Sequence, residues 1–254
     1  MNVTNALLLA GLAGLATSIG SVLGIAIKNP GPKFLTIALG FSAGVMILVS
    51  FMELLQSGIQ AIGTVPAYFA FFVGLVIMFL IDILIPHEYE AEKDIYDKST
   101  SQKQLVRAGL FVALGIAIHN IPEGLATFVA TMQNFKFGVA IAIAVAIHNI
   151  PEGLAISVPV YAATKSRAKA FWLSFFSGFA ELLGACLAAI FLMPFLNPQV
   201  LGFCLALVGG IMVFISIDEL LPISRSYGHE HLSILGFVAG MLVMAISLWM
   251  VSIY

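Results

Sequence analysis

Residues 116–157 read IAIHNIPEGLATFVATMQNFKFGVAIAIAVAIHNIPEGLAIS, and within this stretch the ten residues AIHNIPEGLA occur twice, at 117–126 and at 146–155. Each copy places a histidine, an asparagine and a glutamate inside an otherwise apolar run. Polar and charged groups are costly to bury unless they find partners. The duplicated stretch is therefore where we look first for both the central architecture and the function.

The composition places the chain in a membrane. Of its 254 residues, 61% are hydrophobic and 9% are charged, and the mean hydropathy is +1.07. Soluble domains carry about 25% charged residues, so this chain is expected to be an integral membrane protein with the lipid bilayer as its surroundings. The net charge of -2 says little about partners, and no nucleic-acid partner is expected.

Apolar windows of about 20 residues predict membrane-spanning helices. Eight are expected, over 5–27, 34–57, 66–86, 106–129, 136–160, 168–192, 200–222 and 232–253. The whole chain, 1–254, then forms a single all-α transmembrane domain, in which 87–105 is a long charged loop on the cytoplasmic side. Two interpretations of that loop stay open: a solvated connection, or a mouth of the pore where His87, Glu88 and Glu90 gather metal.

The basic residues predict the orientation. Ten of the 11 lysines and arginines fall on one side of the predicted helices, and Lys136 alone falls on the other. Connections rich in lysine and arginine stay in the cytoplasm. The expected protein is thus a multi-pass protein of the inner (cytoplasmic) membrane with both termini outside.

Both copies of the motif are expected near the membrane midplane. His119 lies about 12 residues, or about 18 Å, from the inner end of its predicted helix, and His148 lies a similar distance from the outer end of the next. Related elements of opposite orientation that meet at the midplane are how many transporters build a substrate site.

The spacing within each copy also has a physical meaning. On a helix, the glutamate shares a face with the histidine four residues earlier and the asparagine three residues earlier. Pro122 and Pro151 have no N–H, so the carbonyl four residues before each loses its helical partner. Such a defect is tolerated at this depth only beside protein, water or an ion. Gly124 and Gly153 allow neighbouring helices to approach closely.

The buried carboxylates need a counter-charge. No lysine or arginine is expected at their depth, which leaves protons and metal ions. Imidazole, amide and carboxylate groups without a thiolate suit zinc, iron(II), manganese or cobalt better than copper(I). The alternative is that each histidine and glutamate form a satisfied polar contact between helices.

A third carboxylate, Glu181 in FFSGFAELLGACLA (175–188), is also expected at the midplane, between Gly178 and Gly184. Its alternative role is a single hydrogen bond between helices. Three carboxylates permit one or two divalent ions and do not decide between them.

A second internal similarity relates ILVSFMELLQ (47–56) to VFISIDELLP (213–222) and aligns Glu53 with Glu219. The helices that carry these segments have opposite orientations. The expected architecture is therefore an inverted repeat, with helices 1–3 and 6–8 arranged around a central pair, helices 4 and 5. Glu53, Asp218 and Glu219 are either groups of a vestibule or gate, or interfacial carboxylates that reach water.

An intramembrane metalloenzyme is the alternative from another functional class. A zinc protease would carry HExxH, with the glutamate as general base, whereas HNxPE offers both histidine and glutamate as ligands. The spans hold too few histidines for a histidine-rich di-iron oxidase, although a carboxylate-bridged di-iron site stays open. A structural or receptor role leaves the buried carboxylates unexplained. We expect a transporter, with no enzymatic activity and no resident cofactor.

These features together resemble the ZIP family of divalent metal transporters: two HNxPEG motifs on consecutive central helices, a glutamate on the next helix, and eight spans. The segment PVYAAT (159–164) resembles the bacterial branch of that family. The resemblance implies uptake of divalent ions into the cytoplasm, with Zn²⁺ foremost and Fe²⁺, Mn²⁺ and Co²⁺ as further transported ions. It leaves open whether the protein is a homodimer.

The resemblance also implies a binuclear metal site, in which Glu123 and Glu152 bridge two ions. The zinc-preferring ion would be held by His119, Glu123, His148 and Glu152. The second ion would be held by Asn120, Glu123, Asn149, Glu152 and Glu181.

Overall fold

The computed structural model describes residues 2–26, 31–84, 102–195 and 197–253. Within these ranges the side chains of residues 102–116, 119, 159, 162, 163 and 250–253 are outside the description. The loop residues His87, Glu88 and Glu90, expected to gather metal, lie outside the described residues, and that interpretation stays a prediction.

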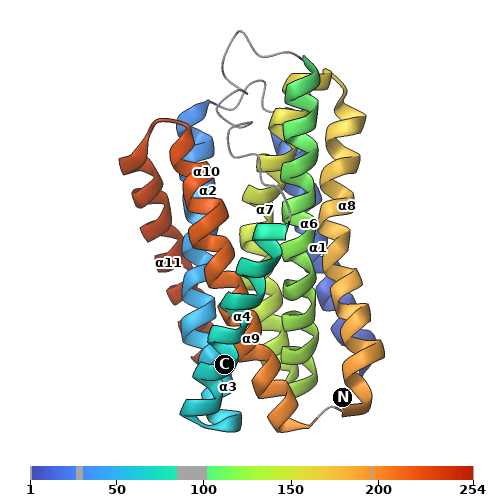
Figure 1. Cartoon of the computed structure of the whole chain (residues 1–254), viewed down its shortest axis with the longest axis vertical. Coiled ribbons are helices and arrows are strands. Elements are labelled where there is room, and N and C mark those ends of the chain that lie inside the picture. Colours follow the sequence, from blue (N-terminus) through green and yellow to red (C-terminus); the bar gives the residue numbers. More distant parts are fainter. Residues whose placement is uncertain (1, 27–30, 85–101, 196, 254) are drawn as a thin grey trace.

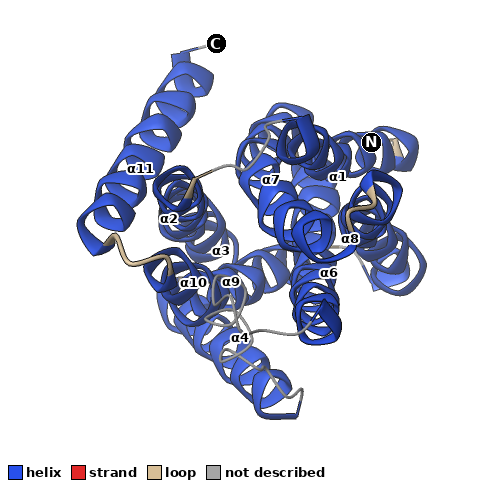
Figure 2. Ribbon diagram, turned by 90° about the horizontal axis from the view of Figure 1, so that it is seen from above, coloured by secondary structure: helices blue, strands red, loops and turns tan. Residues whose placement is uncertain are grey.

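The described residues form helices and connections, without a strand among them (Figures 1 and 2). The helices are α1 (Val3–Ala26), α2 (Pro32–Val49), α3 (Leu55–Ile62), α4 (Thr64–Leu84), α6 (Gln102–Gln133), α7 (Phe135–Thr164), α8 (Arg167–Leu187), α9 (Pro198–Ile215), α10 (Leu221–Ser226) and α11 (Glu230–Ile253). Single π-helical turns at Ser50–Leu54, Ala188–Leu192 and Ser216–Leu220 continue three of these helices, and a short 3₁₀ turn at Met193–Phe195 follows the second.

Seven of the described segments are long and apolar enough to cross a membrane. They are Val3–Ala26, Pro32–Ile62, Thr64–Ile83, Phe135–Val158, Arg167–Phe195, Pro198–Ser226 and Glu230–Trp249. α6 is 32 residues long and carries the first copy of the motif. The prediction of an all-α, multi-pass membrane protein is confirmed.

Several helices are longer than their apolar cores. Hydropathy marks only the apolar core of a helix. The second predicted span continues through the π-helical turn and α3 to Ile62. α6 already begins at Gln102, so residues 102–105, expected in the loop, are helical. That stretch reads QKQL, whose residues all favour helix. A helix that extends beyond the bilayer needs no apolar face there.

The helices pack as two groups. In the first, α1 and α6 each pack against both α7 and α8; in the second, α2 packs against α11, and α4 and α3 pack against α9. Contacts between α2 and α7 and between α6 and α9 join the groups (Figure 2). An inverted repeat would produce such pairing, since α1–α7 then corresponds to α8–α6, and α2–α11 to α9–α4. The repeat itself stays a prediction.

The central hairpin of α6 and α7 fixes the depth of the two motifs. Only Asn134 separates the helices, and its side chain caps α7 by accepting hydrogen bonds from the N–H groups of Lys136 and Phe137 at 2.9 and 3.3 Å. His119 lies 15 residues before Asn134 and His148 lies 14 residues after it. At 1.5 Å per residue both motifs lie about 21–23 Å from the turn, and so come to the same depth.

Close helix approach at the motif glycines is confirmed. A Cβ atom on Gly124 would collide with the carbonyl oxygen of Glu181 in α8, and one on Gly153 would collide with that of Thr17 in α1. The two helices of the hairpin are thus each pressed against a neighbour at the level of the motif. Glycine is required there because the obstructing atoms belong to backbone, which cannot rotate away.

The aligned segments around Ser50 and Ser216 share an unusual backbone. In both segments a π-helical turn begins at the serine. Each serine hydroxyl donates a hydrogen bond to the carbonyl four residues earlier, that of Met46 or Met212, at 2.7 Å. π-helical turns are rare in proteins, and those that occur often lie at functional sites. The shared turn supports the sequence alignment of these two segments.

We expect Gly153→Ala to lower the thermal unfolding midpoint of the purified protein in detergent. The new methyl group meets backbone, and overpacking of this kind costs about 1–3 kcal/mol. Gly11→Ala is the matched control, because there a Cβ would lie 3.8 Å from its nearest neighbour, a methyl group of Leu182. Equal midpoints for the two variants would contradict the close packing of α7 on α1.

Candidate metal centre

Three side chains of the central hairpin converge in the interior of the bundle. Glu123 on α6 and His148 and Glu152 on α7 can each offer one ligand atom, all within 4.8 Å of one another. All three are fully buried. The His148 Nε2 and Glu123 Oε1 atoms are 3.0 Å apart. Nitrogen and carboxylate oxygens at such mutual distances can surround a single divalent ion.

His119, the remaining expected ligand of this position, lies on α6 one helical turn before Glu123. Its side chain is outside the described part of the structure, so its role as a ligand stays a prediction. The described cluster holds the other three members of the predicted zinc-preferring set.

Ser42 of α2 was not predicted from the sequence. Its hydroxyl lies 3.4 Å from Glu152 Oε1 and 3.2 Å from the carbonyl oxygen of His148, and it is fully buried. It thereby contacts both motif residues of α7 from the second group of helices. The small residues in the segment FSAG (41–44) allow this approach, but they give no sequence signal for a contact with residues more than 100 positions away.

The two asparagines are held through their amide nitrogens. Asn120 Nδ2 donates to the Ser177 carbonyl at 2.9 Å, and Asn149 Nδ2 donates to the Ala13 carbonyl at 3.1 Å. Both side chains are fully buried, and neither Oδ1 atom has a hydrogen-bond partner among the described residues. Since these bonds use the nitrogens, the oxygens, which are the metal-binding atoms of an amide, stay available.

Glu181 of α8 is fully buried beside this cluster. Its Oε2 accepts a hydrogen bond from Asn149 Nδ2 at 2.9 Å, and its Oε1 has no partner among the described residues. It does not belong to the compact group of Glu123, His148 and Glu152. The structure therefore brings Glu181 together with Asn149, as the prediction of a second position requires, but it does not test whether a second ion binds.

The glutamates of the site carry a large formal negative charge. Glu123, Glu152 and Glu181 together contribute -3, and no lysine or arginine occurs in the sequence between Arg107 and Lys136 or between Lys136 and Lys165. Buried charges of one sign are strongly unfavourable without a counter-ion. A simple histidine–glutamate contact leaves Glu123 Oε2 without a partner among the described residues. The arrangement is chemically suited to bind one or more divalent cations.

The outlying carboxylates remain separate from this cluster. Glu219 is 5% exposed, whereas Glu53 and Asp218 are partly exposed. Glu53 and Glu219 lie in the two matching π-helical turns. The near-complete burial of Glu219 weakens its interpretation as an interfacial group, while a role of all three at a vestibule or gate stays a prediction.

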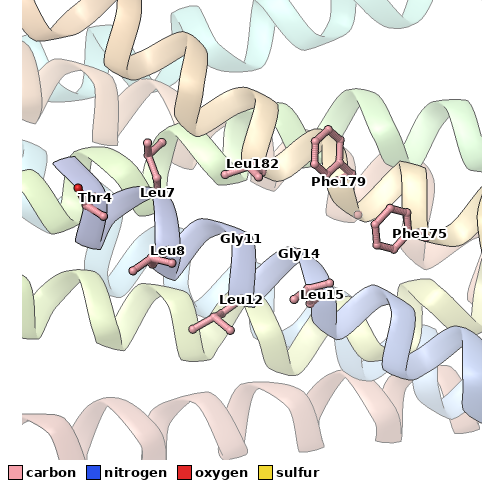
Figure 3. Close-up of a pocket in the computed structure, with 11 residues that line it drawn as sticks. Thr4, Leu7, Leu8, Gly11, Leu12, Gly14, Leu15, Phe175, Phe179 and Leu182 are labelled. Atoms are coloured by element: carbon pink, nitrogen blue, oxygen red, sulfur yellow. The ribbon is translucent and has the colours of Figure 1, made fainter.

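A groove of about 480 Å³ between α1 and α8 is a poor candidate for metal binding. Figure 3 shows its lining: α1 residues from Thr4 to Leu15, and Phe175, Phe179 and Leu182 of α8. Apart from Thr4, these residues offer no side-chain oxygen or nitrogen. The groove is apolar and opens on the outer face, where Leu8 and Leu12 are exposed. A surface of this kind suits contact with lipid.

Comparison with known proteins finds relatives that match nearly the whole chain. The family model described as ZIP Zinc transporter matches residues 86–248. A protein named Zinc transporter ZupT from Chlorobium luteolum is 50% identical over 97% of this chain and 98% of its own length. Proteins of the same name from Chlorobium phaeovibrioides and Corynebacterium aurimucosum are 53% and 47% identical, with 96% and 93% of both chains covered, respectively.

We expect Glu152→Gln to weaken zinc binding more than Ser42→Ala does. The first change removes a proposed ligand charge, while the second removes only a hydrogen bond to that ligand, a loss that typically costs about 10–100-fold in metal affinity. Isothermal titration of zinc into the detergent-purified variants measures both. Glu230→Gln, at an exposed glutamate, is the control and should bind like the unaltered protein. An affinity of Glu152→Gln equal to that control would remove Glu152 from the site.

Proposed function

The chain belongs to the ZIP family, whose members are transporters and not enzymes, and from this premise we propose that it carries zinc ions across the membrane through the buried cluster of Glu123, His148 and Glu152. The resemblance seen in the sequence, to the bacterial ZupT branch of that family, is confirmed by the comparisons.

One observation carries the proposal: a nitrogen and two carboxylates, all fully buried, converge within 4.8 Å in a helix bundle that spans the membrane. The sequence holds no lysine or arginine between Arg107 and Lys136 or between Lys136 and Lys165, the two stretches that carry these three residues. A divalent cation that enters this site exchanges its water ligands for protein ligands and cancels most of the buried charge. A site of this kind at the midplane is a stopping point on a path across the bilayer.

The proposed path holds two unlike metal positions, and Glu123 and Glu152 border both. The first has imidazole and carboxylate ligands, namely His148, its motif partner His119, Glu123 and Glu152. The second is made of oxygen from Asn120, Asn149 and Glu181 together with the same two glutamates. Imidazole suits zinc, whereas an all-oxygen set is better suited to manganese and iron(II) than to zinc. We propose manganese and iron(II) as further transported ions on this ground, and cobalt because the family resemblance implies it.

The proposed direction of transport is into the cytoplasm. A divalent cation carries two charges, and each charge gains about 2.3 kcal/mol on crossing 100 mV of membrane potential. An interior-negative potential of that size thus favours inward movement by about 4.6 kcal/mol. The sequence contains no nucleotide-binding motif, and the membrane potential suffices as the driving force. The distribution of lysine and arginine supports an inner-membrane location with both termini outside.

We expect Glu123→Ala to abolish zinc uptake into proteoliposomes loaded with a zinc-sensitive dye. Glu123 borders both metal positions, so its loss removes a ligand and a charge from each. Folding should survive, because the change removes a buried carboxylate that is costly in the membrane. Glu230→Ala, at an exposed position, should transport normally. Normal zinc flux through a correctly inserted Glu123→Ala protein would contradict the proposed path.

We expect Glu181→Gln to reduce transport of manganese and iron(II) much more than transport of zinc. The substitution keeps the size of the side chain but removes one negative charge from the oxygen-only position. Initial uptake rates of the three metals, compared at equal amounts of protein in the membrane, measure the effect. A fall by the same factor for all three metals would show that Glu181 serves a common step, and the model of two unlike positions would be wrong.

A further inference from the structure

The contacts around the metal centre occur in matched pairs. Asn149 Nδ2 donates to the carbonyl of Ala13 on α1, and Asn120 Nδ2 donates to the carbonyl of Ser177 on α8. The two asparagines are 29 positions apart, and the two carbonyls are 164 positions apart. Each motif helix therefore makes the same contact, one with α1 and the other with α8.

The glycine contacts follow the same two offsets. Gly153 lies against the carbonyl of Thr17, and Gly124 lies against the carbonyl of Glu181. In the same way Gly20 lies against the carbonyl of Ile150, as Gly184 does against that of Ile121. Gly14 and Gly178 each lie against the other's carbonyl oxygen.

These contacts define a residue-by-residue correspondence between α1 and α8. They align GLATSIG (14–20) with GFAELLG (178–184), which share glycine at both ends and alanine before the central polar residue. In this alignment Thr17 occupies the position of Glu181. At this position α8 carries the carboxylate of Glu181, and α1 carries the hydroxyl group of Thr17.

Thr17 lies in the interior of the bundle, as the site residues do. Its side chain is fully buried, and its Oγ1 has no hydrogen-bond partner among the described residues. A buried hydroxyl without a partner is unfavourable by about 1–3 kcal/mol. A Cβ on Gly178 would lie 2.8 Å from this Oγ1, just as a Cβ on Gly14 would lie 3.3 Å from Glu181 Oε2. Both polar groups thus lie beside a glycine that leaves them room.

We propose that Thr17 is a specificity-determining residue of the second metal position, where it is the uncharged counterpart of Glu181. This inference rests on the proposed function. It has two parts. The Thr17 hydroxyl supplies an oxygen to the ion or to a water bound to the ion, on the side opposite Glu181. Its lack of charge also keeps the formal charge of the centre at -3, so that two divalent ions leave an excess of +1 and repel each other.

Thr17→Glu tests the charge directly. A fourth carboxylate would make the centre -4, which two divalent ions neutralise fully. Gly178 leaves space for the larger side chain at position 17, as Gly14 does for Glu181. We expect the purified variant to retain one more zinc or manganese ion per chain than the unaltered protein, by elemental analysis after dialysis. We also expect it to transport both metals more slowly, because a neutral, doubly occupied centre releases ions reluctantly. Thr17→Gln, of the same size but uncharged, should retain no additional ion.

Thr17→Val and Thr17→Ser test the hydroxyl without a change in charge. We expect Thr17→Val to lower manganese affinity more than zinc affinity, by titration calorimetry, and Thr17→Ser to restore both. If Thr17 only packs α1 against α7 and α8, Thr17→Val would leave both affinities unchanged, and the proposal would be overturned. Equal metal retention by Thr17→Glu and Thr17→Gln would overturn it as well. Failure of the unaltered protein to bind any metal would instead reject the proposed function.

Discussion

A carboxylate in the interior of a membrane must be neutralised, and in this protein three of them are buried where the sequence offers no lysine or arginine. Glu123, Glu152 and Glu181 are fully buried on α6, α7 and α8. Much of the surrounding structure serves to hold them despite that cost. The hairpin turn at Asn134 sets the two motifs at one depth, and the motif glycines let α1 and α8 close around them. A divalent ion is the natural counter-charge, and this is the physical basis of the proposed transport site.

Packing and ligand geometry depend on each other here. Asn120 and Asn149 are oriented by carbonyl groups of Ser177 and Ala13, which lie on the neighbours that the motif glycines admit. A larger residue at Gly124 or Gly153 would therefore move the amides as well as the helices. The close approach of helices, which in many membrane proteins serves association alone, also orients the two amides that we propose as metal ligands.

The site lies where the two groups of helices meet. Its proposed ligands come from α6, α7 and α8 of the first group, whereas Ser42 comes from α2 of the second. The π-helical turns at Ser50–Leu54 and Ser216–Leu220 also belong to the second group and carry Glu53 and Glu219. The second group thus carries carboxylates as well, apart from the central cluster. A shift of one group against the other would therefore change the contact between Ser42 and Glu152.

The sequence by itself determined the membrane class, the long helices, the two motifs and the carboxylates that meet in the site, because hydropathy and the spacing of three and four residues are local properties of a helix. It predicted helix ends less well, as at Gln102 and Ile62, since polar helix beyond the apolar core leaves no hydropathy signal. Only the tertiary structure placed Ser42 on Glu152, separated Glu181 from the compact cluster, and matched Thr17 with Glu181. These relations join residues of different helices, and what decides them is how closely the backbones approach, a property that no single helix carries.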